Sequence, residues 1–408
     1  MRVVIIGSGP AGLTAALTLR DKSFTGRIDI FSAEEVPPYS PAALGEYLIN
    51  DQENLLYWQG QDVCEQYDFN CFLGEKIVKV EPDEQYVLTE AGRRREFDKL
   101  LIASGSSLHI PPVVKGADKE GITNFKNIYG AQKIKEMANA SGSTSAVIVG
   151  GGFLGVEIAL CLAKIGIEPS VLNRRGWIMP RLLDKETATY VVEDLEKQGV
   201  NVMLNTEGNR FIGDKQVEGL ITSDGRELTA DFYIAATGVK PNIDFIIDSG
   251  IENDGWGIPV NRYLQTNYDN IYACGDVAQT EDLLTREMTI HGLHTVAVSH
   301  GQTAALNILG AEQKYERQFS MNSLKELSYK LMVVGELEGE EIKYKKEGVL
   351  RKIYLKDNKI NGFVLLGDIS NAGLYFSLLR KREDISEYKD DLLSPLFNLG
   401  MKITKYKR

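Results

Sequence analysis

Cysteine is scarce in this sequence. The 408 residues contain four cysteines, and no two of them form a CxxC pair. Without such a pair, neither a local zinc site nor an adjacent redox dithiol can be built. We therefore expect no metal site and ordinary reduced thiols, as in cytoplasmic proteins.

Basic residues are too few to balance the acidic ones. The 46 Lys and Arg residues stand against 57 Asp and Glu residues, which gives a net charge of −11. Nucleic acids and anionic membrane surfaces attract proteins of the opposite charge sign. We therefore expect neither of them as a partner.

The sequence also lacks an uninterrupted apolar run that is long enough to cross a membrane. The nearest one, residues 146–163, contains Glu157 and three consecutive glycines, so a buried strand, turn and helix fits it better. The apolar residues 1–6 imitate a signal peptide, but glycines and a proline interrupt the run, and we expect it to be retained. The length and the 43% apolar content predict a folded protein of two or three domains.

Glycine is abundant, with 39 residues, and several glycines directly follow short apolar runs. Residues 3–6 predict a strand and residues 11–20 a helix, and the turn between them contains Gly7, Ser8, Gly9, Pro10, Ala11 and Gly12. This glycine spacing permits a tight turn, a close approach of the backbone to a pyrophosphate, and packing of the helix on the strand. A second strand at 27–31 is followed by Glu34, whose carboxylate can accept hydrogen bonds from a ribose.

The same pattern returns in residues 146–155, whose turn contains Gly150, Gly152, Phe153, Leu154 and Gly155. A helix to Lys164 and a strand at 169–172 follow, so the sequence predicts two dinucleotide sites. After this strand, Asn173, Arg174 and Arg175 stand where an acidic residue would bind the ribose. The arginines favour the 2′-phosphate of NADPH. The alternative is NADH bound through Asn173, with the arginines as solvated surface charge.

Three further segments extend this pattern. Together with the two glycine-rich turns, they resemble segments of the FAD-dependent pyridine nucleotide oxidoreductases, which have two dinucleotide-binding domains. Residues 97–105 look like the family's crossover into the NAD domain, and residues 231–242 resemble the return crossover. Residues 272–277 look like the strand whose aspartate, Asp276, binds the FAD ribitol. A helix-capping aspartate is the alternative for Asp276.

The resemblance implies an α/β fold with two Rossmann-like dinucleotide-binding domains, the NAD domain being inserted in the FAD domain, and a C-terminal α+β interface domain. We place the FAD-binding domain at 1–112 and 243–315, the NAD(P)-binding domain at 113–242, and the interface domain at 316–408.

Residues 292–301 open a helix that resembles the family element whose amino end faces the flavin pyrimidine. His294 and His300 are possible proton donors there, against the alternative of packed or solvated histidines. The resemblance gives two sets of contact residues. The FAD set is Gly7, Ser8, Gly9, Pro10, Ala11, Gly12, Glu34, Ile77, Ser104, Gly105, Asp276, His294 and Thr295. The NAD(P) set is Gly150, Gly152, Phe153, Leu154, Gly155, Glu157, Asn173, Arg174 and Gly238.

Many relatives carry a reactive cysteine in the first domain. In the corresponding stretch here, Ala42 occupies that position, and a methyl group is neither a nucleophile nor a disulfide former. Cys64 and Cys71 are interpreted as ordinary thiols. The chain therefore lacks the reactive cysteine that a disulfide reductase or a thiol-dependent peroxidase needs.

The same stretch departs from rubredoxin and ferredoxin reductases as well. Pro41 and Glu46 stand where those relatives have an arginine and a lysine near FAD. In those reductases the lysine pairs with a glutamate of the second domain, and Glu157 occupies the position of that glutamate. Glu157 is thus a candidate nicotinamide neighbour, but Glu46 cannot supply the ion pair, because two carboxylates repel each other.

The last hundred residues predict strands at 329–337, 349–356 and 360–366 and a helix at 372–382. They look like the family's interface domain, and residues 361–370 resemble the closing strand of NADH:rubredoxin reductases and of the flavoprotein part of assimilatory nitrite reductases. We expect a homodimer or a part of a hetero-oligomer. Lys402, Lys405, Lys407 and Arg408 either dock an acidic electron carrier or form a solvated tail.

Together with the sequence observations, the resemblance implies a cytoplasmic oxidoreductase that passes electrons between NAD(P)H and FAD and then to a one-electron protein carrier. Because the sequence has no iron–sulfur motif, the carrier is rubredoxin, a ferredoxin-like protein or an iron–sulfur subunit of a larger complex. One alternative is an NAD(P)H oxidase that reduces oxygen directly to hydrogen peroxide. Another is an NAD(P)H-sensing flavoprotein.

Overall fold

The computed structural model describes residues 1–110, 114–394 and 397. The chain forms two compact units, each built from three segments. The first contains Met1–His109, Lys126–Gln132 and Gly238–Gln318, and the second contains Ile110–Phe125, Lys133–Thr237 and Phe319–Arg408. The boundaries of the three predicted domains stay a prediction.

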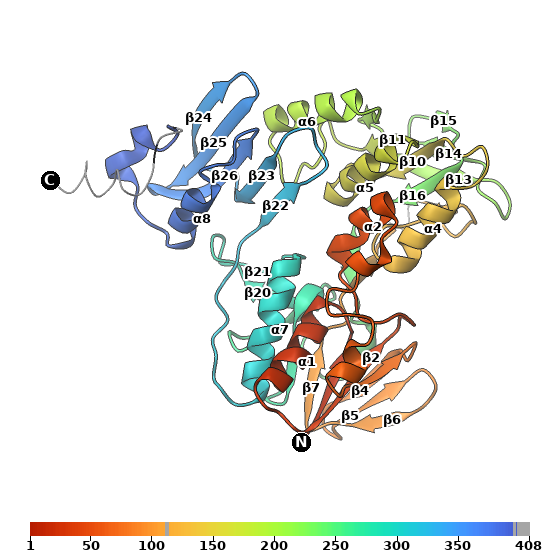
Figure 1. Cartoon of the computed structure of the whole chain (residues 1–408), viewed down its shortest axis with the longest axis vertical. Helices are drawn as coiled ribbons and strands as arrows, with labels where there is room; N and C mark the ends of the chain where they lie inside the picture. Colours follow the sequence, from red (N-terminus) through yellow and green to blue (C-terminus); the bar gives the residue numbers. More distant parts are fainter. Residues whose placement is uncertain (111–113, 395–396, 398–408) are drawn as a thin grey trace. The chain divides into compact units, whose positions relative to one another are not determined.

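The first unit is organised around a five-stranded parallel sheet in the order β19-β7-β1-β2-β3 (Figure 1). Its strands are β1 (Arg2–Ile6), β2 (Arg27–Ser32), β3 (Asn70–Leu73), β7 (Lys99–Ile102) and β19 (Ile271–Ala273). The last four residues of β1 are all buried, as expected for a parallel strand that is covered on both faces. The strand predicted at residues 3–6 is confirmed.

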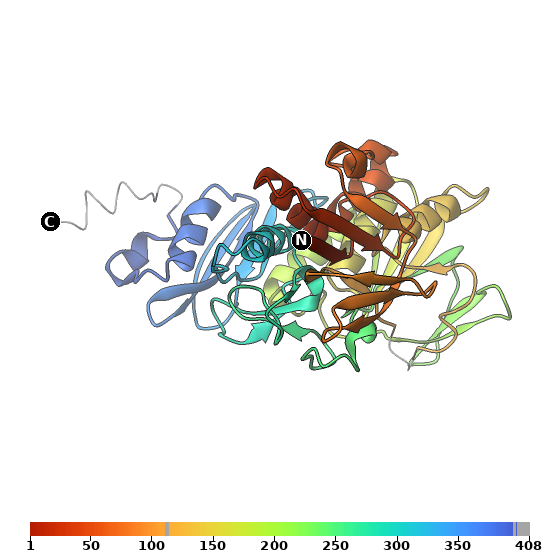
Figure 2. The same ribbon diagram turned by 90° about the horizontal axis from the view of Figure 1, so that it is seen from below.

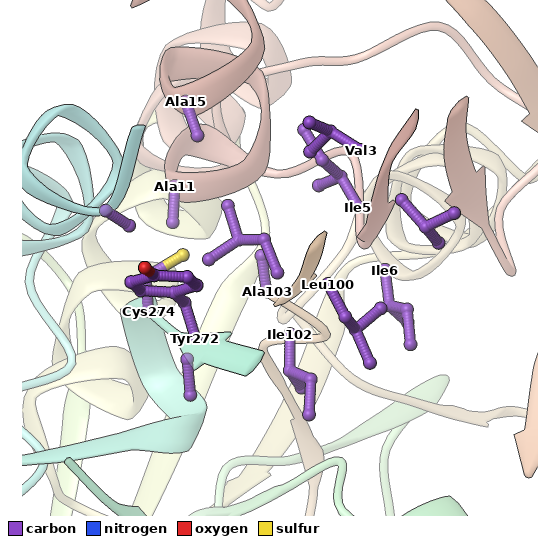
Figure 3. Close-up of a cluster of buried hydrophobic side chains, with 14 of the residues drawn as sticks. Val3, Ile5, Ile6, Ala11, Ala15, Leu100, Ile102, Ala103, Tyr272 and Cys274 are labelled. Atoms are coloured by element: carbon purple, nitrogen blue, oxygen red, sulfur yellow. The ribbon is translucent and has the colours of Figure 1, made fainter. Parts of the chain in front are cut away.

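Helices α1 (Pro10–Asp21) and α7 (His294–Ile308) of the first unit lie side by side (Figures 1 and 2). Gly301 permits their close contact, because a Cβ there would lie 2.3 Å from the carbonyl oxygen of Ala11. Figure 3 shows the core that forms where α1 meets β1, β7 and β19, with Tyr272 and the thiol of Cys274 enclosed among aliphatic side chains.

Smaller elements complete the first unit. They are an antiparallel sheet of β4 (Ile77–Glu81), β5 (Tyr86–Thr89) and β6 (Arg94–Glu96), the pair β8 (Ser106–Leu108) and β17 (Val239–Pro241), the sheet of β18 (Ile258–Pro259), β20 (Ala278–Glu281) and β21 (Met288–Thr289), helices α2 (Leu44–Asn50) and α3 (Val63–Gln66), and 3₁₀ turns η1 (Pro41–Ala43), η2 (Glu53–Leu55), η3 (Asp244–Ile246) and η4 (Gly275–Val277).

The second unit contains another five-stranded parallel sheet, in the order β12-β11-β10-β16-β9. Its elements are β9 (Ile122–Thr123), β10 (Ser145–Val149), β11 (Glu168–Asn173), β12 (Asn201–Leu204), β16 (Phe232–Ala235), helices α5 (Phe153–Lys164) and α6 (Lys185–Lys197), and the small sheet of β13 (Gly208–Ile212), β14 (Gly219–Thr222) and β15 (Glu227–Leu228). Helix α4 (Ile128–Ala138) is divided between the two units at Gln132. The predicted α/β fold with two Rossmann-like sheets is confirmed.

The C-terminal part of the second unit is an antiparallel sheet in the order β22-β23-β26-β25-β24 (Figure 1). It consists of β22 (Met321–Leu324), β23 (Leu331–Gly335), β24 (Glu340–Lys346), β25 (Val349–Lys356) and β26 (Lys359–Leu366), followed by α8 (Ala372–Arg380) and the 3₁₀ turn η5 (Ser386–Asp391). Asp357 and Asn358 form the predicted turn between β25 and β26, with φ of 51° and 55°. Helix α8 ends two residues earlier than predicted, because Arg382 adopts a left-handed φ of 51°.

The expectation of free thiols is wrong for Cys64 and Cys71, which form a disulfide with their Cα atoms 6.1 Å apart. The chain turns after α3, and the amide of Phe69 donates to the carbonyl of Cys64 at 2.8 Å, so that β3 returns beside the helix. The other two cysteines, Cys161 and Cys274, are free and buried.

Among the helices of the described residues, none combines the length and the apolar character that a membrane span requires. The terminal basic residues proposed as a docking tail, Lys402, Lys405, Lys407 and Arg408, lie outside the described residues.

Candidate nucleotide sites

The first glycine turn joins β1 to α1 at the carboxyl edge of its parallel sheet. Gly7 has a φ of +108°, and a Cβ there would lie 2.1 Å from the carbonyl oxygen of Ala103. A Cβ on Gly12 would lie 2.0 Å from the carbonyl oxygen of Gly7, so neither position accepts a side chain. At Gly9, by contrast, a Cβ would meet no described atom within 4 Å.

This open space lies at the amino end of α1. Gly9 caps the helix without a side-chain hydrogen bond, Pro10 begins it, and its first turn has no acidic residue. The neighbouring Ser8 is buried and donates to Ser32 Oγ at 3.1 Å. Uncapped amides and the positive end of the helix dipole, facing open space, suit the pyrophosphate of a dinucleotide such as FAD.

The second glycine turn, between β10 and α5, repeats this geometry in the second unit. A Cβ on Gly150 would lie 2.3 Å from the carbonyl oxygen of Ala236, and one on Gly155 would lie 1.8 Å from that of Gly150. Gly152 again faces space free of described atoms and caps a helix that has no acidic residue in its first turn. Phe153 and Leu154 begin that helix. The turn therefore suits a second pyrophosphate.

The carboxylate predicted to bind the FAD ribose lies just beyond β2. Glu34 accepts a hydrogen bond from the hydroxyl of Tyr39 at 3.3 Å. Burial raises the pKa of Glu34 above its ordinary value, and the hydrogen bonds from Tyr39 and Asn127 partly offset this rise. The hydroxyl of Tyr39 in turn accepts from the amide of Ile128 at 3.0 Å.

The carboxylate predicted to bind the ribitol, Asp276, lies in η4 directly after β19. Its Oδ2 accepts from Ser106 Oγ at 2.8 Å and lies 3.1 Å from Lys126 Nζ. The alternative of a helix cap does not hold, because η4 has no side-chain cap and begins after Cys274. Ser106 and Lys126 were missed by the sequence reasoning, since no local pattern links Lys126 to a residue 150 positions away.

Residues 126–132, which we call the 126–132 segment, thus contact both carboxylates that were predicted for FAD. Lys126 pairs with Asp276, and Asn127 hydrogen-bonds Glu34. The hydroxyl of Tyr129 also accepts from the amide of Glu35 at 2.8 Å. The segment belongs to the same unit as both carboxylates.

Helix α7 begins at His294 and contains Thr295 in its first turn. The ring of His294 packs edge-on against Trp58 with 5.6 Å between centroids, and burial lowers the pKa of His294. His300 is 1% exposed, and its Nδ1 accepts from the amide of Gly275 at 3.2 Å. Burial lowers the pKa of His300 to about 3, so this histidine stays neutral and does not suit the role of proton donor.

A buried pair precedes this helix and was also missed. Nε2 of His291 lies 2.9 Å from Asp282 Oδ2, and the two side chains are 3% and 6% exposed. Burial alone would raise the pKa of Asp282, but hydrogen bonds from His291 and from the amides of Thr285 and Leu284 hold it below its ordinary value. The pair fixes the loop between β20 and β21 to the residues that lead into α7.

The remaining residues predicted for FAD lie on the frame of the first unit. Ile77 is buried in β4. Ser104 Oγ donates to the carbonyl of Asn242 at 2.7 Å, which joins the two crossover segments. Gly105 has a φ of +67° and faces open space among the described residues.

The residues predicted for the second ribose follow β11. Asn173 is 7% exposed, and its amide donates to the carbonyls of Arg175 at 2.9 Å and Trp177 at 2.6 Å. The side chain of Arg174 is 70% exposed, and its Nη1 lies 3.5 Å from Glu207. Gly238, also predicted for NAD(P), directly follows Thr237 and begins the last segment of the first unit.

Glu157 lies on α5 in the second unit. Burial raises its pKa above the ordinary value, nearby Lys325 lowers it, and Glu326 raises it. In the first unit, Ala42 is exposed in η1 and Glu46 lies in α2. Because two cysteines form a disulfide and the other two are buried, none of the four offers an exposed thiol.

Comparison with known proteins shows the family of the chain. A family model described as pyridine nucleotide-disulphide oxidoreductase matches residues 1–301. The chain is 33% identical over 410 residues to a nitrite reductase [NAD(P)H] of Bacillus subtilis, covering 97% of this chain and 49% of that protein. It therefore spans about half the length of that relative.

Two further proteins are similar over their full length. The NADH-rubredoxin oxidoreductase of Clostridium acetobutylicum is 27% identical over 402 residues, covering 96% of this chain and 97% of that protein. A solved covalent complex of putidaredoxin reductase with putidaredoxin has a chain that superposes with a TM-score of 0.90 at 22% identity, covering 99% of this chain and 98% of that one. The similarity to this solved structure shows that the two chains share a fold.

Proposed function

Because the chain belongs to the pyridine nucleotide-disulphide oxidoreductase family and is an FAD-dependent NAD(P)H oxidoreductase, we propose that it passes electrons from NAD(P)H through FAD to a one-electron protein carrier. The observation that carries this proposal is the pair of matching glycine turns. Each presents an uncapped helix end to open space at the carboxyl edge of its own parallel sheet.

The chain's own residues bind and orient the two nucleotides. In the first unit, the amides of α1 hold one pyrophosphate, Glu34 a ribose and Asp276 the ribitol. The positive end of α7, with His294 and Thr295, stabilises negative charge at the flavin end. When bound, FAD supplies the chemistry, since it takes up a hydride and releases electrons singly.

In the second unit, the amides of α5 would hold the pyrophosphate of NAD(P)H, and Glu157 would be a neighbour of the nicotinamide. The ion pair between Arg174 and Glu207 is long and solvated, and is therefore weak. The exposed guanidinium of Arg174 can thus pair with a 2′-phosphate instead. The proposal therefore favours NADPH over NADH.

The acceptor is proposed to be a protein rather than a thiol substrate. The chain has no exposed thiol to carry a disulfide exchange or to reduce peroxide. One relative is named for rubredoxin, and one structural neighbour is joined to putidaredoxin. We infer a carrier of this kind, or an iron–sulfur subunit of a larger complex, with the chain acting as a homodimer or within a hetero-oligomer.

Stopped-flow spectroscopy tests the proposal. The purified FAD-loaded protein is mixed with NADPH or NADH, and loss of the flavin absorbance gives the rate of reduction. The absorbance is then restored with air, rubredoxin or a ferredoxin. We expect fast reduction, slow recovery in air and fast recovery with a protein carrier. Recovery in air at the turnover rate, with no competing protein acceptor, would replace the proposal by a peroxide-forming oxidase.

A further inference from the structure

A disulfide secures the edge of the first parallel sheet. Strand β3, which contains Cys71, stands at the end of the strand order and pairs with β2. The disulfide joins it to Cys64 of α3, and both cysteines are half-buried. Partly exposed disulfides exchange with external thiols more readily than enclosed ones. The bond is therefore a second link that holds β3 in place, and a reversible one.

Strand β3 leads to the carboxylate assigned to the FAD ribose. Its last residue, Leu73, lies opposite Ser32 of β2. The amide of the next residue, Gly74, donates to the carbonyl of Glu34 at 2.9 Å. The amide of Glu34 donates to Ser32 Oγ at 3.1 Å. The backbone of Glu34 is thus held from both β2 and the end of β3, and Gly74 is close to Cys71 in the sequence.

Residues 64–71, which we call the 64–71 loop, are also fixed to α1. Nε of Arg20 donates to the carbonyl of Tyr67 at 3.0 Å, and its Nη2 donates to that of Asp68 at 2.7 Å. The guanidinium lies 5.8 Å from the ring centre of Phe69. None of these contacts uses a sulfur atom, so they should persist when the disulfide is reduced. The reduced chain should therefore stay folded and be loosened only at β3.

We propose that Cys64 and Cys71 form a redox-reversible site that sets how tightly the chain holds FAD. The co-reactant is a dithiol. One of its thiolates attacks a sulfur of the disulfide and releases the other cysteine, and its second thiolate then closes a disulfide within the dithiol and releases the first cysteine. The chain gains two electrons and two protons, which the dithiol loses.

Reduction removes one of the two links that hold β3, so Glu34 is positioned less firmly and FAD affinity falls. FAD retention would then report the thiol–disulfide state of the surroundings. This inference rests on the proposed function in one respect, which is the assignment of Glu34 to FAD.

The test is the dissociation constant of FAD, measured by flavin fluorescence with and without dithiothreitol. Coupling between two sites of one protein is commonly about 5- to 150-fold, and we expect a rise within this range on reduction. The double variant Cys64→Ser, Cys71→Ser should bind FAD as weakly as the reduced parent. It should not respond to dithiothreitol, which controls for direct reduction of the flavin. An unchanged dissociation constant in the reduced parent would overturn the inference.

Cys161→Ala is the matched control, because Cys161 is a buried free thiol of the second unit. This variant keeps the disulfide and should respond to dithiothreitol as the parent does. A lost response in Cys161→Ala would assign the effect to the wrong thiol and contradict the proposal.

Thermodynamic linkage supplies a second readout, which needs no turnover. If the oxidised chain binds FAD more tightly, FAD must favour the disulfide by the same factor. A tenfold coupling makes the reduction potential of the disulfide about 30 mV more negative in the FAD-loaded protein than in the apoprotein. Thiol alkylation after equilibration in dithiothreitol redox buffers gives both potentials, and equal potentials would contradict the coupling.

Glu34→Ala separates this inference from the proposed function. It should weaken FAD binding and diminish the response to dithiothreitol, because the side chain that β3 helps to position is gone. If Glu34→Ala leaves FAD affinity unchanged, the assignment of Glu34 to FAD fails. If it weakens FAD binding but the parent does not respond to dithiothreitol, the inference on the disulfide fails while the proposed function stands.

Discussion

A single methyl group added to one glycine turn or to the other should show which turn binds which nucleotide. Gly9 and Gly152 occupy equivalent caps, and their backbones are extended, with φ, ψ of −67°, −176° and −78°, −175°. Alanine adopts this conformation readily, and a Cβ at either position would meet no described atom within 4 Å. Gly9→Ala and Gly152→Ala should therefore fold normally, and each methyl group should project toward the space assigned to a pyrophosphate.

The expected loss of affinity follows from the hydrogen bonds between the helix amides and the phosphate, which the methyl group would break or lengthen. Loss or lengthening of one or two hydrogen bonds to a charged group costs about 2 to 4 kcal/mol. This corresponds to a weakening of about 30- to 700-fold. Gly9→Ala should lose FAD on purification. Gly152→Ala should keep FAD and lose NAD(P)H affinity by this factor.

The assay is the flavin content of each purified variant, followed by NADPH titration of the FAD-loaded protein and a thermal melt. Each variant is the control of the other. Gly155→Ala is a contrasting variant, because its Cβ would lie 1.8 Å from the carbonyl oxygen of Gly150 and should disrupt folding. Full FAD content in Gly9→Ala, or loss of FAD rather than of NADPH binding in Gly152→Ala, would refute the assignment of the two turns.

Three further predictions concern single contacts. Arg174→Ala should weaken NADPH binding about tenfold and leave NADH binding unchanged, whereas an equal loss for both would contradict the role of this arginine. The unfolding free energy should fall as the pH drops through the lowered pKa of Asp282, because the unfolded carboxyl binds its proton at higher pH. Asp282→Asn should remove this part of the dependence in urea titrations. Reductant should lower the unfolding free energy by about 2.5 kcal/mol through the Cys64–Cys71 disulfide, and the double serine variant should not respond to reductant.

The glycine turns could be predicted because everything that defines them is local. The strand predicted at 3–6 extends over Arg2–Ile6, and the helix predicted at 11–20 extends over Pro10–Asp21. Continuous buried β-branched residues, a tight turn and an apolar helix occur there within a single short stretch. The same holds for the turn between β10 and α5.

The edges of the C-terminal sheet could not be predicted in this way. β22 (Met321–Leu324) is short, and β24 (Glu340–Lys346) has no buried residue. Both are edge strands, and β24 is held largely by backbone pairing to β25. A strand with no buried side chains leaves no alternation of apolar and polar residues for a sequence pattern to detect.

The cation that pairs with Asp276 escaped prediction for a related reason. Asp276 forms an ion pair with Lys126, which lies 150 positions away in the sequence, so the fold and not the spacing brings the two side chains together. A local motif can place a carboxylate at the edge of a sheet, but the charge that sets its protonation can come from any segment that packs nearby.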